Sequence, residues 1–413
     1  MARFIYNLIV YLQMFSNVVD TTLRTELSPE MKTFYDMNLI EAAGPNLVHN
    51  QFGEPHPIPA NGGKTIEFRK FSTLPKATTP LTEGVTPDGK NLEVTAITAN
   101  VNQYGDYIRQ SDMLELTAID NTIVQTTKKL GDQAGRTLDT VVRDILQSGT
   151  NVLYASKWSG TTETVVAHRY EIDATAKMKV DTIERAVTKL RANNVKPMDD
   201  GYYVAIIHPN VAYDIRRDPD FIDIHKYAQP KELYTGEIGE IAGVRFTQST
   251  EGKVYRGANL ASNSRTLTVN NAQGITASKT VAFDGGTVAE HALKGREIII
   301  GTTHTKVSDN TASVITTTDD ITCTDNTVIY PGEGGAAGVS VYGCLLLGKD
   351  AYATTEITGG GLETIVKQKG YGEDPLNQRS SVGWKATKTA AILQQEAVLR
   401  VECCSRFSSA EEN

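Results

Sequence analysis

The chain has 413 residues, of which 40% are hydrophobic and 22% charged, and its formal net charge is −8. This composition is typical of a soluble globular protein with two or three domains or one elaborate domain. The acidic balance argues against a dedicated nucleic-acid-binding protein, which usually carries a basic face. This charge is compatible with a protein that lies near nucleic acid without binding it tightly. Abundant threonine and valine, with 34 glycines, favour β-rich structure with many turns.

The amino-terminal part, residues 1–63, predicts an arm that reaches over another surface. Residues 1–20 are apolar, but the run is short for a membrane span and lacks a small-residue cleavage site. They are interpreted as an arm that packs on a neighbour or as a misassigned start, with a secretory signal as the remaining alternative. Residues 28–50 carry the spacing of a helix, and the proline-rich residues 51–63 predict an extended crossing. No other stretch is apolar enough to span a membrane.

Residues 64–104 predict an extended β-hairpin. Residues 64–71 and 92–104 alternate apolar and polar side chains, as strands do, and they flank a polar loop at 73–91 that contains three prolines. Two strands alone have little core, so such a hairpin needs a partner surface to offset its ordering cost.

Residues 111–149 predict one long amphipathic helix. Its apolar residues recur mostly at three- and four-residue steps: Leu116, Ile119, Ile123, Leu130, Ala134, Leu138, Val141 and Ile145. Asp112 or Thr117 could cap its start. A coiled coil is the alternative, but the steps do not sustain a strict heptad, and Gly131 and Gly135 interrupt the surface. We therefore expect the apolar side to pack on a sheet of the same chain.

The middle of the chain predicts an α+β unit at residues 179–252, after a weakly strand-like stretch at 151–170. The expected elements are a helix at 179–193, a buried strand at 202–207, short helices at 210–217 and 221–227, and a tight hairpin at 236–249 around Ala242 and Gly243. The continuous apolar run YYVAII is typical of a strand covered on both faces.

Residues 253–338 differ in composition, being rich in Thr, Ser, Asn and Gly. Strand-sized runs separated by turn dipeptides predict a small all-β module inserted into a host domain, with a glycine-rich hinge at 332–338. The chain then resumes with predicted strands at 339–347, 356–369, 382–393 and 396–406. We expect the last two to pair across Gln394 and Gln395.

No catalytic, cofactor-binding or metal-binding residues are predicted. His208 precedes a proline that starts a helix, so a hydrogen-bonded capping role is favoured. The acidic residues Asp199, Asp200, Asp218, Asp220 and Asp223 match no calcium loop and are better explained by turns and caps. Residues 61–65 resemble half a phosphate loop but lack its full spacing and its helix. The four cysteines, Cys323, Cys344, Cys403 and Cys404, form no CxxC pair and are expected to be reduced and packed, which suits a reducing cytoplasm.

Five blocks of the chain resemble the phage major capsid proteins of the N4 gp56-like family. They are SPEMKTFYDMNLIEAA at 28–43, the long block at 47–107 that begins LVHNQFGEPHPIPANGGKTIEF, AIDNTIVQTTKKLGDQAGRTLDTVVRDILQSGTNV at 118–152, GYYVAIIHPNVAYDIRRD at 201–218, and GEDPLNQRSSVGWKATKTAAILQQEAVLRVE at 372–402. The similarity covers roughly 28–250 and 339–405. The apolar residues 1–20 do not match the family's usual polar start, and the module at 253–338 varies within such proteins.

The resemblance implies an α+β, HK97-like capsid fold. It assigns residues 1–63 to an N-terminal arm, 64–104 to an extended loop (E-loop) that lies across a neighbouring subunit, 105–178 to a peripheral domain with spine helix 111–149, 179–252 to an axial domain, 253–338 to an inserted β-rich module and 339–413 to return strands. The polar side of the spine helix should then face the shell interior or neighbouring subunits.

The function implied is that of a major capsid protein of a tailed phage or prophage. Its copies would form pentamers and hexamers that close an icosahedral shell around double-stranded DNA. Portal and scaffolding proteins would be partners, no membrane would be involved, and the protein would reside in the virion and in host cytoplasm during assembly. The alternatives are an encapsulin-like bacterial nanocompartment and, on different grounds, a secreted β-rich adhesin.

Overall fold

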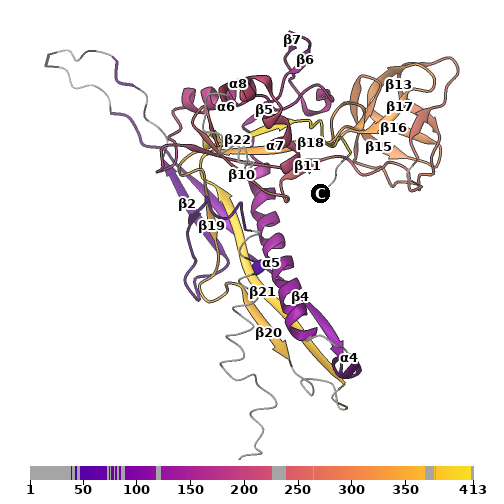
Figure 1. Cartoon of the computed structure of the whole chain (residues 1–413). Helices are drawn as coiled ribbons and strands as arrows, with labels where there is room; N and C mark the ends of the chain where they lie inside the picture. Colours follow the sequence, from indigo (N-terminus) through magenta and orange to yellow (C-terminus); the bar gives the residue numbers. More distant parts are fainter. Residues whose placement is uncertain are drawn as a thin grey trace, which may run out of the picture. The chain divides into compact units, whose positions relative to one another are not determined.

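The computed structural model describes residues 39, 42, 43, 47–71, 74, 76–78, 80, 83–84, 89–117, 122–225, 239–263, 265–367, 376 and 378–410 (Figure 1). Most of the predicted arm helix at 28–50, and all of residues 1–38, lie outside this range. The chain divides into two compact units. Unit 1 comprises Met1–Val142 and Ala353–Leu393, and unit 2 comprises Arg143–Tyr352 and Gln394–Asn413. No helix within the described residues is both long and apolar enough to cross a membrane.

Unit 1 is built on a five-stranded sheet. Its strands are β1 (Glu54–Pro55), β4 (Asn102–Ser111), β19 (Tyr352–Thr355), β20 (Glu363–Lys367) and β21 (Arg379–Ile392). The longest strand, β21, pairs antiparallel with β4, from Arg379 opposite Ser111 to Lys388 opposite Asn102. The strand therefore continues past the predicted end at residue 104, through residues 105–111, up to the start of the helical segment at Asp112.

The spine helix packs on this sheet through its apolar side. The contacting cluster consists of Leu39, Leu130, Ala134, Leu138, Val382, Trp384 and Ala386. This confirms that the helix packs on a sheet of its own chain. Within the predicted helix at 111–149 the structure describes α4 (Asp112–Thr117) and α5 (Thr122–Gln147), and residues 118–121 between them lie outside the described range. Ser111, the last residue of β4, accepts a hydrogen bond from the Leu114 N–H at 3.3 Å, so the helical segment is capped one residue earlier than expected.

Gly131 lets a second helical segment cross α5 closely. A Cβ at this position would lie 2.7 Å from the Leu39 carbonyl oxygen and 2.8 Å from the Ala42 Cβ. These separations are shorter than van der Waals contact, so only glycine fits without displacing the crossing segment. The glycine that interrupted the predicted helix surface therefore marks a packing contact.

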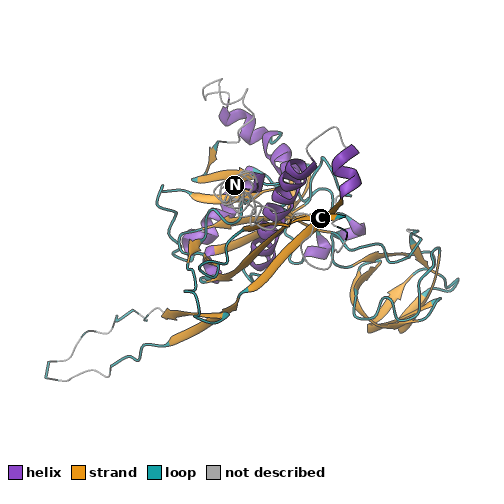
Figure 2. Ribbon diagram, turned by 90° about the horizontal axis from the view of Figure 1, so that it is seen from below, coloured by secondary structure: helices purple, strands orange, loops and turns teal. Residues whose placement is uncertain are grey.

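The predicted hairpin is confirmed as β2 (Thr65–Phe71) and β3 (Val94–Asn100). The strands pair antiparallel in full register, from Thr65 opposite Asn100 to Phe71 opposite Val94. They form a two-stranded sheet with no third strand, and Figure 2 shows them as a narrow ribbon. The predicted second strand at 92–104 is divided, since residues from Asn102 onward belong to β4.

Unit 2 contains a seven-stranded mixed sheet in the order β5-β22-β18-β8-β10-β9, with β11 also paired to β18. The strands are β5 (Val152–Tyr154), β8 (Tyr203–Ile207), β9 (Glu240–Ile241), β10 (Val244–Gln248), β11 (Lys253–Tyr255), β18 (Val341–Leu347) and β22 (Val398–Cys403). Every residue of β8 and β18 is buried, as the continuous apolar runs predict. The hairpin at Ala242 and Gly243 is also confirmed, and both residues have positive φ, 52° and 81°.

The helices of unit 2 are α6 (Val180–Ala192), α7 (Pro209–Arg216) and α8 (Pro219–His225), close to the predicted ranges. The stretch at 151–170 forms β5, the small hairpin of β6 (Lys157–Ser159) and β7 (Thr162–Thr164), and the start of the short 3-10 helix η2 (Arg169–Glu171). One pairing prediction is wrong: β21 and β22 do not pair with each other. The strand β22 lies between β18 and β5, whereas β21 belongs to the sheet of unit 1.

The inserted module is a closed six-stranded β-barrel (Figure 1). Its strands are β12 (Leu267–Val269), β13 (Ile275–Asp284), β14 (Glu297–Ile300), β15 (Thr303–Asn310), β16 (Val314–Cys323) and β17 (Val328–Pro331). Buried aliphatic residues from all six strands fill its centre. β11 pairs with β18 of the host sheet, so the change in composition at residue 253 precedes the first barrel strand by one host strand.

Candidate functional site

The β2–β3 hairpin exposes large apolar side chains along its outer half. Phe71 is 58% exposed, Leu74 54%, Leu92 55% and Val94 50%. Phe71 and Val94 are directly opposite each other in the ladder, so the exposed groups adjoin. Leu74 and Leu92 lie in the loop just beyond this pair. Several exposed large apolar side chains near one end of a two-stranded ribbon are costly in water and are typical of a protein–protein contact surface. We call these four residues the hairpin apolar ladder.

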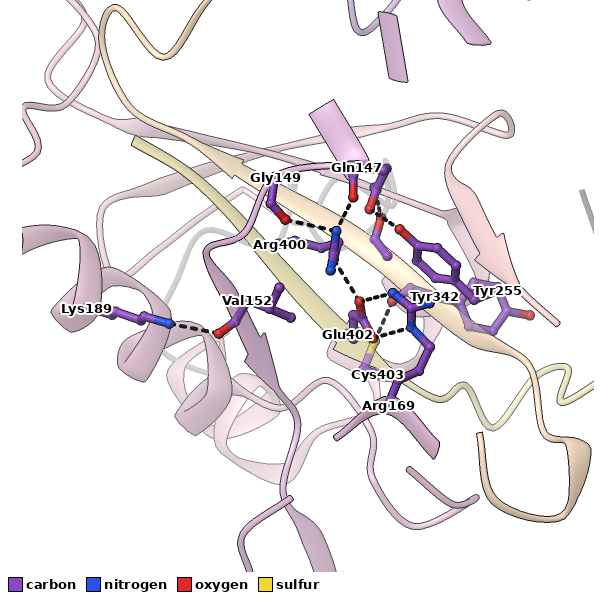
Figure 3. A network of polar contacts seen from close by, with 11 residues as sticks. Gln147, Gly149, Val152, Arg169, Lys189, Tyr255, Tyr342, Arg400, Glu402 and Cys403 are labelled. Atoms are coloured by element: carbon purple, nitrogen blue, oxygen red, sulfur yellow. Dashed lines mark hydrogen bonds and ion pairs between the residues drawn. The ribbon is translucent and has the colours of Figure 1, made fainter. Parts of the chain in front are cut away.

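The second candidate site, in unit 2, is a cluster of buried charged residues that we call the buried ionic junction (Figure 3). The Glu402 carboxylate on β22 is fully buried between two guanidinium groups. Arg169 donates to it twice, Nε to Oε2 at 2.7 Å and a terminal nitrogen to Oε1 at 2.6 Å. The Arg400 Nε lies 2.7 Å from Oε1. Such a charge leaves water only when it is paired this closely.

Arg400 also binds the carboxyl end of the spine helix. Its guanidinium donates to the carbonyl oxygen of Gln147 and, at 3.1 Å, to that of Gly149. The last carbonyls of a helix lack intrahelical partners and carry partial negative charge, so a guanidinium stabilises them. Arg400 thus connects the last turn of α5 to β22 of the seven-stranded sheet.

Tyr255 closes the junction from β11. The Arg169 guanidinium lies 3.6 Å from the centroid of its ring, and its hydroxyl donates to Gln147 Oε1 at 3.0 Å. Burial raises the pKa of the Tyr255 hydroxyl above its usual range. Burial also disfavours the charge on Arg169, but the hydrogen bonds and the charge of Glu402 outweigh it and raise the Arg169 pKa. The group therefore stays charged and locked, which indicates a structural anchor.

The sequence predictions did not identify this junction. Its one local signal is the alternation Arg400, Val401, Glu402 within a strand whose neighbours are all apolar. Both charged residues point to the same face, and on a buried strand that requires partners from elsewhere in the chain. Arg169 lies 233 positions away from Glu402, so no sequence spacing connects them.

A second buried pair fixes the end of the arm to the spine helix in unit 1. The His49 backbone N–H donates to Asp139 Oδ1 at 2.7 Å, and its Nδ1 lies 2.6 Å from Asp139 Oδ2. The two residues are 1% and 0% exposed, and Asp139 belongs to α5. His49 is therefore held by both backbone and side chain.

Residues that were considered for chemistry occupy structural positions. His208 accepts a hydrogen bond from the Asn210 N–H at 3.2 Å, which caps α7, and Asp218 accepts one from the Val180 N–H at 2.8 Å. The four cysteines are free thiols, and three of them are buried. No cluster of His, Cys, Asp and Glu suited to a metal ion occurs in the part of the chain that the structure describes.

Residues 93–292 match the model of a protein family described as "Phage capsid protein". Over these residues, just under half of its length, the chain is similar to phage capsid proteins. The matched residues begin at the loop end of β3 and include the spine helix, much of the seven-stranded sheet and part of the barrel.

Two solved capsid structures share the fold. The capsid of the cyanophage P-SCSP1u is 13% identical with a TM-score of 0.50, covering 87% of this chain and 88% of that one. The capsid asymmetric unit of cyanophage Pam1 is 12% identical with a TM-score of 0.53, covering 84% of this chain and 86% of that one. This protein therefore has the HK97-type capsid fold, as the resemblance implies. No curated protein matches its sequence.

Proposed function

We propose that this protein assembles with copies of itself into pentamers and hexamers that close an icosahedral shell around the double-stranded DNA of a tailed phage or prophage. In this proposal its role is structural and not enzymatic. Residues 64–104 act as the E-loop, 105–178 as the peripheral domain, 179–252 as the axial domain and 253–338 as an outer insertion. Portal and scaffolding proteins join it during assembly in the host cytoplasm, and the finer family is N4 gp56-like.

The observation that carries the proposal is the hairpin apolar ladder. Its four side chains are each at least half exposed, and the ribbon that bears them has no third strand or core of its own. Because each side chain is already about half buried, covering the rest against a second copy would gain roughly half of the 1.5–3 kcal/mol of full burial, about 1 kcal/mol each. A second copy supplies that surface to every subunit when the contact repeats from copy to copy, as it does in a closed ring or shell.

Deletion of residues 73–91 tests the proposal. We expect the wild-type protein to form capsomers or shells in negatively stained micrographs, and the deletion to leave soluble subunits or isolated capsomers. Intact shells from the deletion would contradict the role of the loop. A wild-type protein that stays strictly monomeric at high concentration would contradict self-assembly itself.

A matched pair of point variants separates the ladder from general hairpin stability. Phe71→Ser removes the 58%-exposed ring, whereas Glu67→Ser removes an exposed polar side chain on the same strand. We expect only Phe71→Ser to reduce shell yield. Equal yields from both variants would exclude the ladder as the contact. Shells that enclose protein cargo and no DNA would favour a nanocompartment.

A further inference from the structure

The chain beyond the last strand, β22, runs across unit 2 as an extended segment. We call residues 405–410 the C-terminal strap. Its first half is fixed to α7: Ser405 Oγ donates to the Asn210 carbonyl oxygen at 3.0 Å, and the Arg406 N–H donates to Asp214 Oδ2 at 2.9 Å. Asp214 is only 6% exposed, so the strap supplies a hydrogen bond to a carboxylate that has little access to water.

The second half of the strap reaches both linkers of the barrel. The buried Tyr342 hydroxyl donates to the Ser408 carbonyl oxygen at 2.9 Å. The Ser340 N–H, at the end of the second linker, donates to the Ser409 carbonyl oxygen at 3.0 Å. The Arg256 guanidinium, at the start of the first linker, donates to the Ala410 carbonyl oxygen. Of these three successive strap carbonyls, that of Ser408 therefore binds β18 of the host sheet, and those of Ser409 and Ala410 bind the two linkers.

The two linkers also lie against each other. A Cβ on Gly257 of the first linker would lie 2.1 Å from Pro331 Cβ, which ends the last barrel strand, and 2.2 Å from Glu333 Oε2. The linkers thus form a narrow neck of two chain segments. Besides the strap, the neck and barrel contact the rest of unit 2 through the Ala336 N–H, which donates to the Ile172 carbonyl oxygen at 2.8 Å, and through Tyr170, whose ring stacks on His304 with centroids 4.5 Å apart. The strap supplies hydrogen bonds to both linkers.

We infer that the C-terminal strap is a lock on the neck of the inserted barrel. When the strap is bound, it fixes Arg256 and Ser340 to the seven-stranded sheet and holds the barrel in one orientation on its neck. When it is released, the neck loses its bonds to the strap and the barrel can reorient while both sheets stay folded. The inference concerns a single chain and does not rest on the proposed assembly.

Two truncations of the full chain test this lock. A chain ending at Phe407 lacks the two carbonyls that bind the neck and the Ser408 carbonyl that binds Tyr342, whereas a chain ending at Ala410 retains all three. Amide hydrogen exchange is measured by mass spectrometry on peptides covering residues 256–266 and 332–340. We expect exchange at the neck to be about fivefold faster in the shorter chain, the factor for losing one hydrogen bond of ordinary net strength. Exchange in the longer chain should equal that of the full chain.

A third variant keeps the test decisive if the shorter chain does not fold. Tyr342→Phe removes the hydroxyl that donates to Ser408 and accepts from Asn210 Nδ2 at 3.0 Å, and it leaves the buried ring in place. Because the strap loses its bond to Tyr342, neck exchange should accelerate in the same direction. Peptides covering β8 and β18 should be unchanged in every variant. Equal neck exchange in both truncations, or an increase that extends to β8 and β18, would overturn the lock.

Discussion

Replacing Glu402 with glutamine would remove the charge at the centre of the buried ionic junction while keeping the size of the side chain. Two guanidinium groups, Arg169 and Arg400, would then face each other across a neutral amide. Breaking a buried pair by removing one partner costs about 3–5 kcal/mol because the remaining charge is uncompensated.

The structure places Glu402→Gln at the lower end of that range. The Arg169 side chain is 26% exposed, so water can solvate part of its charge. Arg400 is only 11% exposed, but it keeps the carbonyl oxygens of Gln147 and Gly149. We therefore expect a loss of about 3 kcal/mol, or roughly 150-fold in the unfolding equilibrium constant.

Urea unfolding of the unassembled protein, followed by far-ultraviolet circular dichroism, measures this loss. Glu363→Gln is the matched control, because Glu363 forms an ion pair with Lys385 in which both side chains are nearly half exposed. The control should lose well under about 1 kcal/mol. The double variant Glu402→Gln, Arg169→Met should regain part of the stability lost by Glu402→Gln. If Glu402→Gln unfolds at the urea concentration of the control, the junction does not hold the sheet as argued.

Two further substitutions test packing and burial in unit 1. Gly131→Ala should destabilise the protein by about 1–3 kcal/mol in the same assay, because its Cβ would meet the crossing segment at Leu39, although alanine is the better helix former. Gly361→Ala is the control, since its Cβ would meet nothing within 4 Å. Equal urea midpoints of unfolding for the two variants would refute the close crossing. Lys388→Met should stabilise the protein by about 1 kcal/mol at neutral pH, since the lysine is 8% exposed and burial lowers its pKa. Lys388 binds its proton more tightly in the unfolded chain, so the stability of the wild type should rise as pH increases from the lowered folded pKa towards 10.5. If the difference in stability between the wild type and Lys388→Met stays constant up to pH 10, burial of the lysine charge is not its cause.

The spacing of apolar residues predicted those helices and strands in which burial of one or both faces leaves a regular pattern in the sequence. Leu130, Ala134 and Leu138 recur at helical spacing because one side of α5 is buried, and the uninterrupted apolar run of β8 appears because both faces of that strand are covered. The wrong pairing of β21 with β22 had a different origin. Alternation shows that a segment is a strand but not which strand lies beside it, and these neighbours in sequence enter different sheets.

The candidate site was predictable only in part, for the same reason. The hairpin was evident because its strands are separated by a polar loop and have no room for a core. The junction of Arg169, Arg400 and Glu402 was not, because buried charges are identified by their partners, which come from distant parts of the chain. Likewise, the start of α4 depends on Ser111, which serves both as the last residue of a strand and as a cap.

The closure of the inserted barrel has a consequence for a protein packed at high density. Each of its six strands pairs on both sides, so the barrel has no free strand edge at which a second chain could add. Barrels on neighbouring copies can therefore be brought close together without joining into a continuous sheet. Turns beyond the last paired residues, such as the one at Gly301 that follows the pairing of Ile300 with Thr303, should accept inserted peptides without opening the barrel. The module can in this way vary in sequence and length while the sheets that carry it remain unchanged.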